Sequence, residues 1–159
     1  MDQKKLSRWL KVITAILFLM LLCVFFVLSP MIDNGLAGLT PANRNDYHAF
    51  FIVARIMLLP CFAALWFFWR ICCNIGLDRS FCSENVRYLK NIAILALSDT
   101  VLCFLTVIVF ACIAAFGAGF YIASLVMIVI GIAVASAALV LAHLTEKATA
   151  LKAENDLTI

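Results

Sequence analysis

The sequence predicts an all-α integral membrane protein: a single domain over residues 1–159 built as a bundle of four transmembrane helices. Hydrophobic residues make up 66% of the 159-residue chain, and the mean hydropathy is +1.11. Charged residues are absent from two long stretches, 12–32 and 100–145. One crossing of a bilayer needs about 20 apolar residues, so the second stretch is long enough for two crossings. Runs of this length lack the polar face that a soluble helix needs, and their apolar residues do not alternate as in a spanning strand.

The first two spans are expected at residues 10–28 and 49–69. The first span follows a basic segment, but its apolar run is too long for a signal peptide and no small-residue cleavage site follows it, so we expect an uncleaved span. Turn-forming residues then predict an irregular connector; they are Pro30, Gly35, Gly38 and Pro41. The second span contains Arg55 and Pro60.

The last two spans are expected at residues 91–116 and 120–143, joined by a tight turn at Gly117-Ala118-Gly119. A polar loop, 70–90, precedes them, and a tail, 144–159, follows them. Within the loop, Ser83 followed by Glu84 is typical of a helix start. We therefore expect the third span to begin as an amphipathic helix outside the lipid, and the helix of the fourth span to continue into the tail.

The distribution of basic residues predicts the orientation of the chain. Ten Lys and Arg residues flank the spans on one side, and Arg44 alone lies on the other. Basic residues collect on the cytoplasmic side of membrane proteins. Both termini and the 70–90 loop are therefore expected in the cytoplasm of a bacterial cell, with the four spans in its cytoplasmic membrane.

Arg55 and Asp99 are the two charged residues expected within spans. Each costs about +2.5 to +3.5 kcal/mol near the centre of a membrane helix, which makes both candidates for a function. An ion pair between the second and third spans is one interpretation. If Trp69 and Asn91 lie at equal depth, however, Asp99 is level with Cys61, about 9 Å from Arg55 along the helix. Arg55 could also extend its long side chain to the outer surface.

Small residues recur at helical spacing along the fourth span. They are Gly131, Ala135, Ala138 and Ala142. Gly131 and Ala135 form the small-x-x-x-small pattern that lets membrane helices approach closely. Packing within one chain is the ordinary interpretation of such a stripe, and a homodimer face is the alternative.

The sequence contains no pattern that indicates catalysis, a cofactor or a metal. Cys72, Cys73 and Cys82, even with His143, match no standard metal spacing. No phosphate loop, nucleophile triad or zinc-protease helix occurs. Acidic residues dilute the basic loop, and anionic lipid explains its charge better than direct nucleic-acid binding does. We therefore expect no enzyme, no cofactor and no metal site.

Two segments of this chain resemble a known family. The segment GLDRSFCSENVRYLKNI at residues 76–92 is one, and the ending KAENDLTI at residues 152–159 is the other. Together with Pro60, they resemble the small bacterial four-span membrane proteins known as domain of unknown function 2975. Members are often encoded beside a very small helix-turn-helix transcription regulator. The resemblance therefore implies a cytoplasmic DNA-binding protein as partner, and it brings no catalytic residues.

Two functions follow as hypotheses. In the first, the protein is a regulatory or interaction protein that holds the small regulator on its cytoplasmic segments. The candidate docking residues are Phe81, Ser83, Glu84, Asn85, Arg87, Lys90, Glu154, Asn155 and Asp156. The alternative is that neither segment binds a partner: the loop only caps a helix, and the tail is only solvated. In the second hypothesis, a small oligomeric transporter or channel uses Arg55 and Asp99.

The predicted topology can be tested by thiol labelling of intact cells. In a background without other cysteines, Ser83→Cys should react with a membrane-impermeant maleimide only after the cells are permeabilised, because the 70–90 loop is expected in the cytoplasm. Labelling of intact cells would contradict the orientation.

Overall fold

The computed structural model describes residues 3–28, 41–77, 79–113 and 118–156. Four long helices account for nearly all of them. They are α1 (Gln3–Cys23), continued by the π-helical turn η1 (Val24–Leu28), then α3 (Pro41–Gly76), α4 (Ser83–Ile113) and α5 (Ala118–Asp156). Each of the four contains a stretch long and apolar enough to cross a membrane. The predicted fold class, an all-α membrane protein with four spans, is confirmed.

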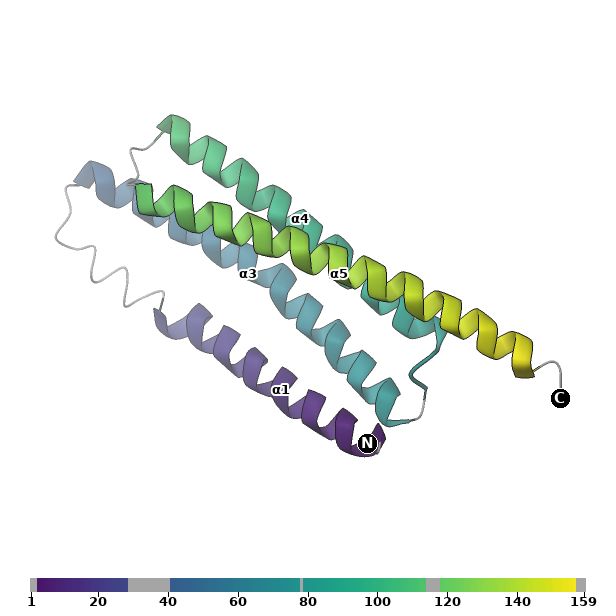
Figure 1. The fold of residues 1–159 in the computed structure, drawn as a ribbon. Helices are drawn as coiled ribbons and strands as arrows, with labels where there is room; N and C mark the ends of the chain where they lie inside the picture. Colours follow the sequence, from purple (N-terminus) through teal and green to yellow (C-terminus); the bar gives the residue numbers. More distant parts are fainter. Residues whose placement is uncertain (1–2, 29–40, 78, 114–117, 157–159) are drawn as a thin grey trace.

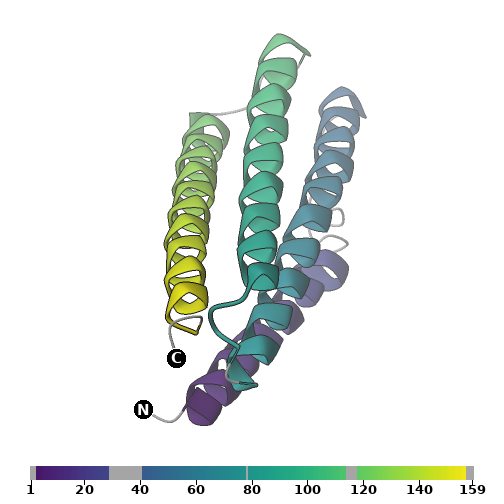
Figure 2. The same ribbon diagram turned by 90° about the vertical axis from the view of Figure 1, so that its right-hand side faces the viewer.

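The helices pack in the order in which they occur in the chain. Extensive contacts join α1 to α3, α3 to α4 and α4 to α5. Figures 1 and 2 show the result, which is an open row of antiparallel helices with α1 and α5 at its two edges. The start of α1, the end of α3, the start of α4 and the end of α5 lie at the same end of the row. Ten of the twelve Lys and Arg residues flank the helices here, and we call it the basic end.

Some helix boundaries differ from the expected spans. Pro41, expected in the connector, is instead the first residue of α3. Proline suits the first position of a helix because its fixed φ is helical and its missing N–H would be unpaired there anyway. Ala118 and Gly119, expected in a tight turn, begin α5. Residues 29–40 of the connector, residues 114–116 at the expected end of the third span, and Gly117 of the turn lie outside the described residues.

The expected loop 70–90 is mostly helical, because α3 continues to Gly76 and α4 begins at Ser83. The carbonyl of Cys82 accepts hydrogen bonds from the backbone N–H groups of Asn85, at 3.1 Å, and Val86, at 3.4 Å. Cys82 therefore caps α4, which begins at Ser83 as the sequence predicts. The third span does begin outside the apolar region, and α5 does continue beyond His143, as the sequence predicts.

Small side chains bring α4 and α5 together. A Cβ atom at Gly131 would overlap the hydroxyl of Thr100 on α4. Ala135, Ala138 and Ala142 continue this face of α5, and all three are buried, with exposures of 4%, 6% and 1%. The stripe of small residues therefore packs within the chain, which is the ordinary interpretation of such a pattern.

Polar side chains join α1 to α3. The hydroxyl of Ser7 donates a hydrogen bond to the carbonyl of Cys72, at 2.7 Å, and the hydroxyl of Thr14 lies 4.0 Å from the Cys72 sulfur. Gly76 leaves room for Ser7, since a Cβ there would lie 2.7 Å from its hydroxyl oxygen. Farther along, Phe18 packs edge-on against Phe62, with ring centroids 5.4 Å apart. The N-terminal helix thus contacts α3 near its start, through Ser7 and Thr14, and farther along, through Phe18.

The α4–α5 contact can be tested with two matched glycine substitutions. Gly131→Ala should lower the melting temperature in detergent, because overpacking a tight contact typically costs about 1–3 kcal/mol. Gly119→Ala is the control, since nothing lies within 4 Å of the added Cβ. The double change Thr100→Ala with Gly131→Ala should recover part of the loss. Equal melting temperatures for the two single variants would contradict the contact.

Candidate functional site

The basic end contains a cleft between the start of α4 and the last turns of α5. Its volume is about 550 Å³. We call it the α4–α5 cleft; its lining residues are Ser83, Val86, Arg87, Lys90, Glu146, Thr149 and Ala150. Three of them, Ser83, Arg87 and Lys90, are among the docking residues predicted from the sequence. The structure therefore brings part of that set into one concave surface.

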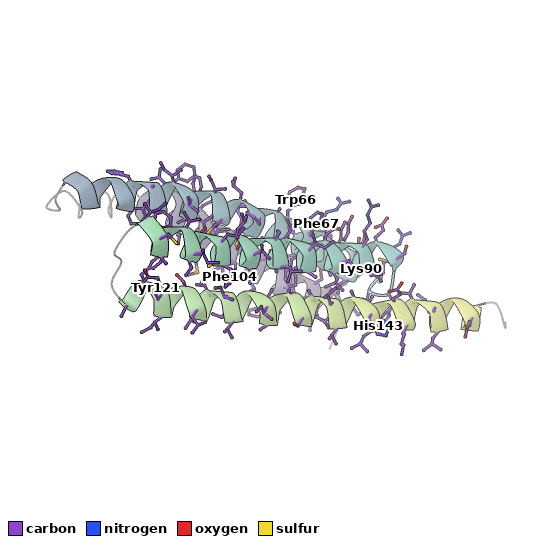
Figure 3. All side chains as sticks on the ribbon, turned by 90° about the horizontal axis from the view of Figure 1, so that it is seen from above. Trp66, Phe67, Lys90, Phe104, Tyr121 and His143 are labelled. Carbon is purple, nitrogen blue, oxygen red and sulfur yellow. The ribbon has the colours of Figure 1, made fainter. Side chains whose placement is uncertain are left out.

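The charges of the cleft are mixed. Lys90 donates to Glu146 across the cleft, with 3.0 Å between Nζ and Oε2, and Figure 3 shows Lys90 between the two helices. Both side chains are about half exposed, so the pair adds at most about 1 kcal/mol to stability. Arg87 is one turn and Glu84 about two turns closer to the start of α4, and both are exposed. The surface thus presents charged groups of both signs to a partner.

Asn85, which the sequence analysis placed among the docking residues, is 2% exposed. Its amide Nδ2 donates to the carbonyls of Arg79, at 3.3 Å, and Ser80, at 3.0 Å, while its Oδ1 accepts from Asn74 Nδ2 at 2.7 Å. The backbone N–H groups of Leu77 and Arg79 both donate to the carbonyl of Asn74. The side chain of Asn85 therefore holds the 77–82 loop and is not available to a partner.

The remaining predicted docking residues are not among those that line the cleft. Phe81 is 54% exposed in the loop, and Glu84 is exposed on the first turn of α4. Glu154 is exposed on α5, two turns beyond Glu146. Asn155 and Asp156 belong to the last turn of α5, but their side chains, like residues 157–159, lie outside the described part of the chain.

The sequence analysis missed an aromatic contact between α3 and α4 at this end. Tyr88 stacks on Phe67, with ring centroids 5.7 Å apart and planes 26° apart. The hydroxyl of Tyr88 also accepts a hydrogen bond from Arg70 Nη2 at 3.5 Å. An antiparallel register with Trp69 level with Asn91 sets Arg70 level with Lys90, close to Tyr88, so the Arg70–Tyr88 contact was within reach of the sequence. The same register sets Phe67 level with Ala93, so it does not predict the stacking of Phe67 on Tyr88.

Asp99 and Arg55 occupy different levels of the row. The sulfur of Cys61 lies 3.9 Å from Asp99 Oδ2, as the register predicts, and Arg55 is six residues earlier on α3. The other carboxylate oxygen, Oδ1, is buried and has no hydrogen-bond partner among the described residues. The structure therefore brings Asp99 to Cys61. Within the described ranges, no group of three His, Cys, Asp or Glu residues could hold a metal ion.

The chain is similar to one family model and to one curated relative. The family model described as "Protein of unknown function (DUF2975)" matches residues 33–159, which contain α3, α4 and α5. The chain is 30% identical over 140 residues to the "Uncharacterized membrane protein YoaS" of Bacillus subtilis (strain 168), a match that covers 87% of this chain and 86% of the relative. No solved structure matches.

Because the family model covers most of the chain and the relative is similar over most of both lengths, the protein belongs to the DUF2975 family of membrane proteins.

Proposed function

We propose that this protein is a regulatory membrane protein that holds a small cytoplasmic helix-turn-helix transcription regulator at the α4–α5 cleft. The observation that carries the proposal is the cleft itself, which gathers Ser83, Arg87 and Lys90 with Glu146 of α5. The class of partner rests on the family resemblance, since members are often encoded beside such a regulator. The excess of basic residues supports a cytoplasmic location for this end.

The shape of the basic end supports docking of a folded partner. α5 continues past the start of α4 (Figures 1 and 3). We call its end beyond the cleft, residues 151–156, the ledge. Glu154 extends the ledge with an exposed carboxylate. Charged groups of both signs can be matched by only some partners, and such complementarity favours specificity over affinity.

The alternative function, a small oligomeric transporter or channel using Arg55 and Asp99, has less support. A permeation pathway should place both charges in one wet cavity. Neither residue lines the α4–α5 cleft, and the hydrogen-bond contact of Asp99 is with Cys61. The interaction hypothesis therefore accounts for more of the described residues.

The proposal predicts that filling the cleft abolishes capture of the regulator. Thr149→Trp should reduce recovery of the helix-turn-helix protein at least tenfold when the tagged membrane protein is purified from its native bacterium and analysed by mass spectrometry. Thr145→Trp is the matched control. Thr145 lies one turn earlier on α5, bonds its own helix in the same way, and is not part of the cleft lining.

The ledge can be tested by removing residues 154–159. No span loses a residue, so insertion and melting temperature should be unchanged, while capture of the regulator should be lost and expression of the genes beside it should change. If the shortened chain still retains the regulator, the ledge is not part of the docking surface. Equal capture by the Thr149→Trp and Thr145→Trp variants would overturn the proposal for the cleft.

A further inference from the structure

A second groove lies at the opposite edge of the row, between α1 and α3. Its volume is about 270 Å³, and its walls are apolar. The residues that form most of these walls are Ala15, Leu19 and Leu22 of α1, and Leu65, Trp66 and Trp69 of α3. The hydroxyl of Thr14 also reaches the groove, but it already donates to the carbonyl of Leu10 at 2.7 Å. The groove thus offers an apolar ligand contact area without an unsatisfied polar group.

The walls of this groove face outward. Leu19 is 69% exposed and Trp66 is 62% exposed, although both lie in stretches apolar enough to cross a membrane. In a bilayer, this surface meets lipid chains. A concave apolar surface bounded by two indole rings holds a flexible chain better than a convex helix face does, because the chain contacts both helices at once. Trp is also the residue that collects where lipid chains meet headgroups.

Basic residues follow the groove toward the basic end. On α1, helical periodicity places Lys11 one turn and Arg8 two turns before Ala15. Lys11 also lies between Ser7 and Thr14, both of which contact Cys72 of α3, so it belongs to the side of α1 that faces α3. On α3, Arg70 is one turn after Trp66 and is exposed.

We propose that the α1–α3 groove binds an anionic phospholipid, with one acyl chain along the groove and the phosphate held by Lys11, Arg8 and Arg70. Charge complementarity identifies this occupant: a zwitterionic lipid carries its own cation, whereas an anionic headgroup leaves the phosphate free for basic residues. Basic pockets between transmembrane helices are a known way of selecting anionic headgroups. Lys and Arg side chains reach such a headgroup because their stems can lie along apolar surface.

The site is separate from the α4–α5 cleft, since α1 and α5 are at the two edges of the row (Figure 2). It therefore goes beyond the proposed docking function, and either can fail without the other.

Tryptophan fluorescence tests the site directly. In a Trp9→Phe background, all indole emission comes from Trp66 and Trp69, which both line the groove. The full chain is placed in phosphatidylcholine nanodiscs containing a small fraction of chain-brominated phosphatidylglycerol, or the same fraction of chain-brominated phosphatidylcholine. We expect stronger quenching by the anionic lipid, because it is concentrated in the groove. Equal quenching by the two lipids overturns the proposal.

Charge variants separate a specific site from general attraction to a basic protein. Lys11→Gln with Arg70→Gln should weaken the apparent affinity for the anionic lipid by about 30-fold, if each cation contributes as juxtamembrane Lys and Arg typically do. Lys147→Gln with Lys152→Gln removes the same charge from α5 and is the control. Equal loss in the two variants would mean that only net charge matters, which overturns the site.

If the Arg70→Gln change disturbs folding by removing the Arg70–Tyr88 contact, a variant that fills the groove provides a second test. Ala15→Phe leaves every charge in place and occupies the groove, so the preference for the anionic lipid should disappear while the melting temperature in detergent is maintained. Unchanged preference contradicts the groove as the site. Native mass spectrometry identifies the occupant: a bound phosphatidylglycerol supports the proposal, whereas a dimer with no bound lipid shows that a second copy covers the groove and overturns it.

Discussion

The absence of water from the membrane interior is the constraint on which the rest of the structure depends. Hydroxyl groups in the spans cannot leave their hydrogen bonds to solvent, so they donate to their own helix. Thr100 donates to Ala96, and Ser136 donates to Ile132, each four residues back. Where the hydroxyl groups are satisfied within their own helix, as along the apolar part of the α4–α5 contact, association depends on close packing. This explains why Gly131 and three alanines join α4 to α5.

An open row gives each helix a different environment. α4 lies between two neighbours and contains several of the buried residues, including Ala93 and Phe110. α1 and α5 each have one extensive helix contact, and most of their surface is apolar and exposed. Lipid covers that surface in a membrane. Each of the two grooves lies between an edge helix and its one extensively packed neighbour.

Much of the fold could be predicted from the sequence, because long uncharged stretches fit only membrane-spanning helices. The antiparallel register was also within reach: setting Trp69 level with Asn91 places Asp99 at Cys61, where the structure has it. Features that depend on a single side chain were harder to predict from the sequence. Asn85 is a polar residue in a polar segment, and nothing local distinguishes a solvated amide from one that holds a loop. Pro41 follows several turn-forming residues, which indicates a connector, but the fixed φ of proline also suits the first position of a helix.

Because the helices pack in series, the two edges of the row are mechanically connected through its middle. A displacement of α1 can reach the start of α4 by way of α3, through the stacking of Phe67 on Tyr88 and the amide contact between Asn74 and Asn85. It can also reach it directly, because Gln3 accepts a hydrogen bond from Ser80, whose carbonyl accepts another from Asn85. These contacts lie at the basic end, and Asn85 and Tyr88 border the residues that line the α4–α5 cleft. The two edges of the row are therefore joined at the basic end, through α3 and through the loop before α4.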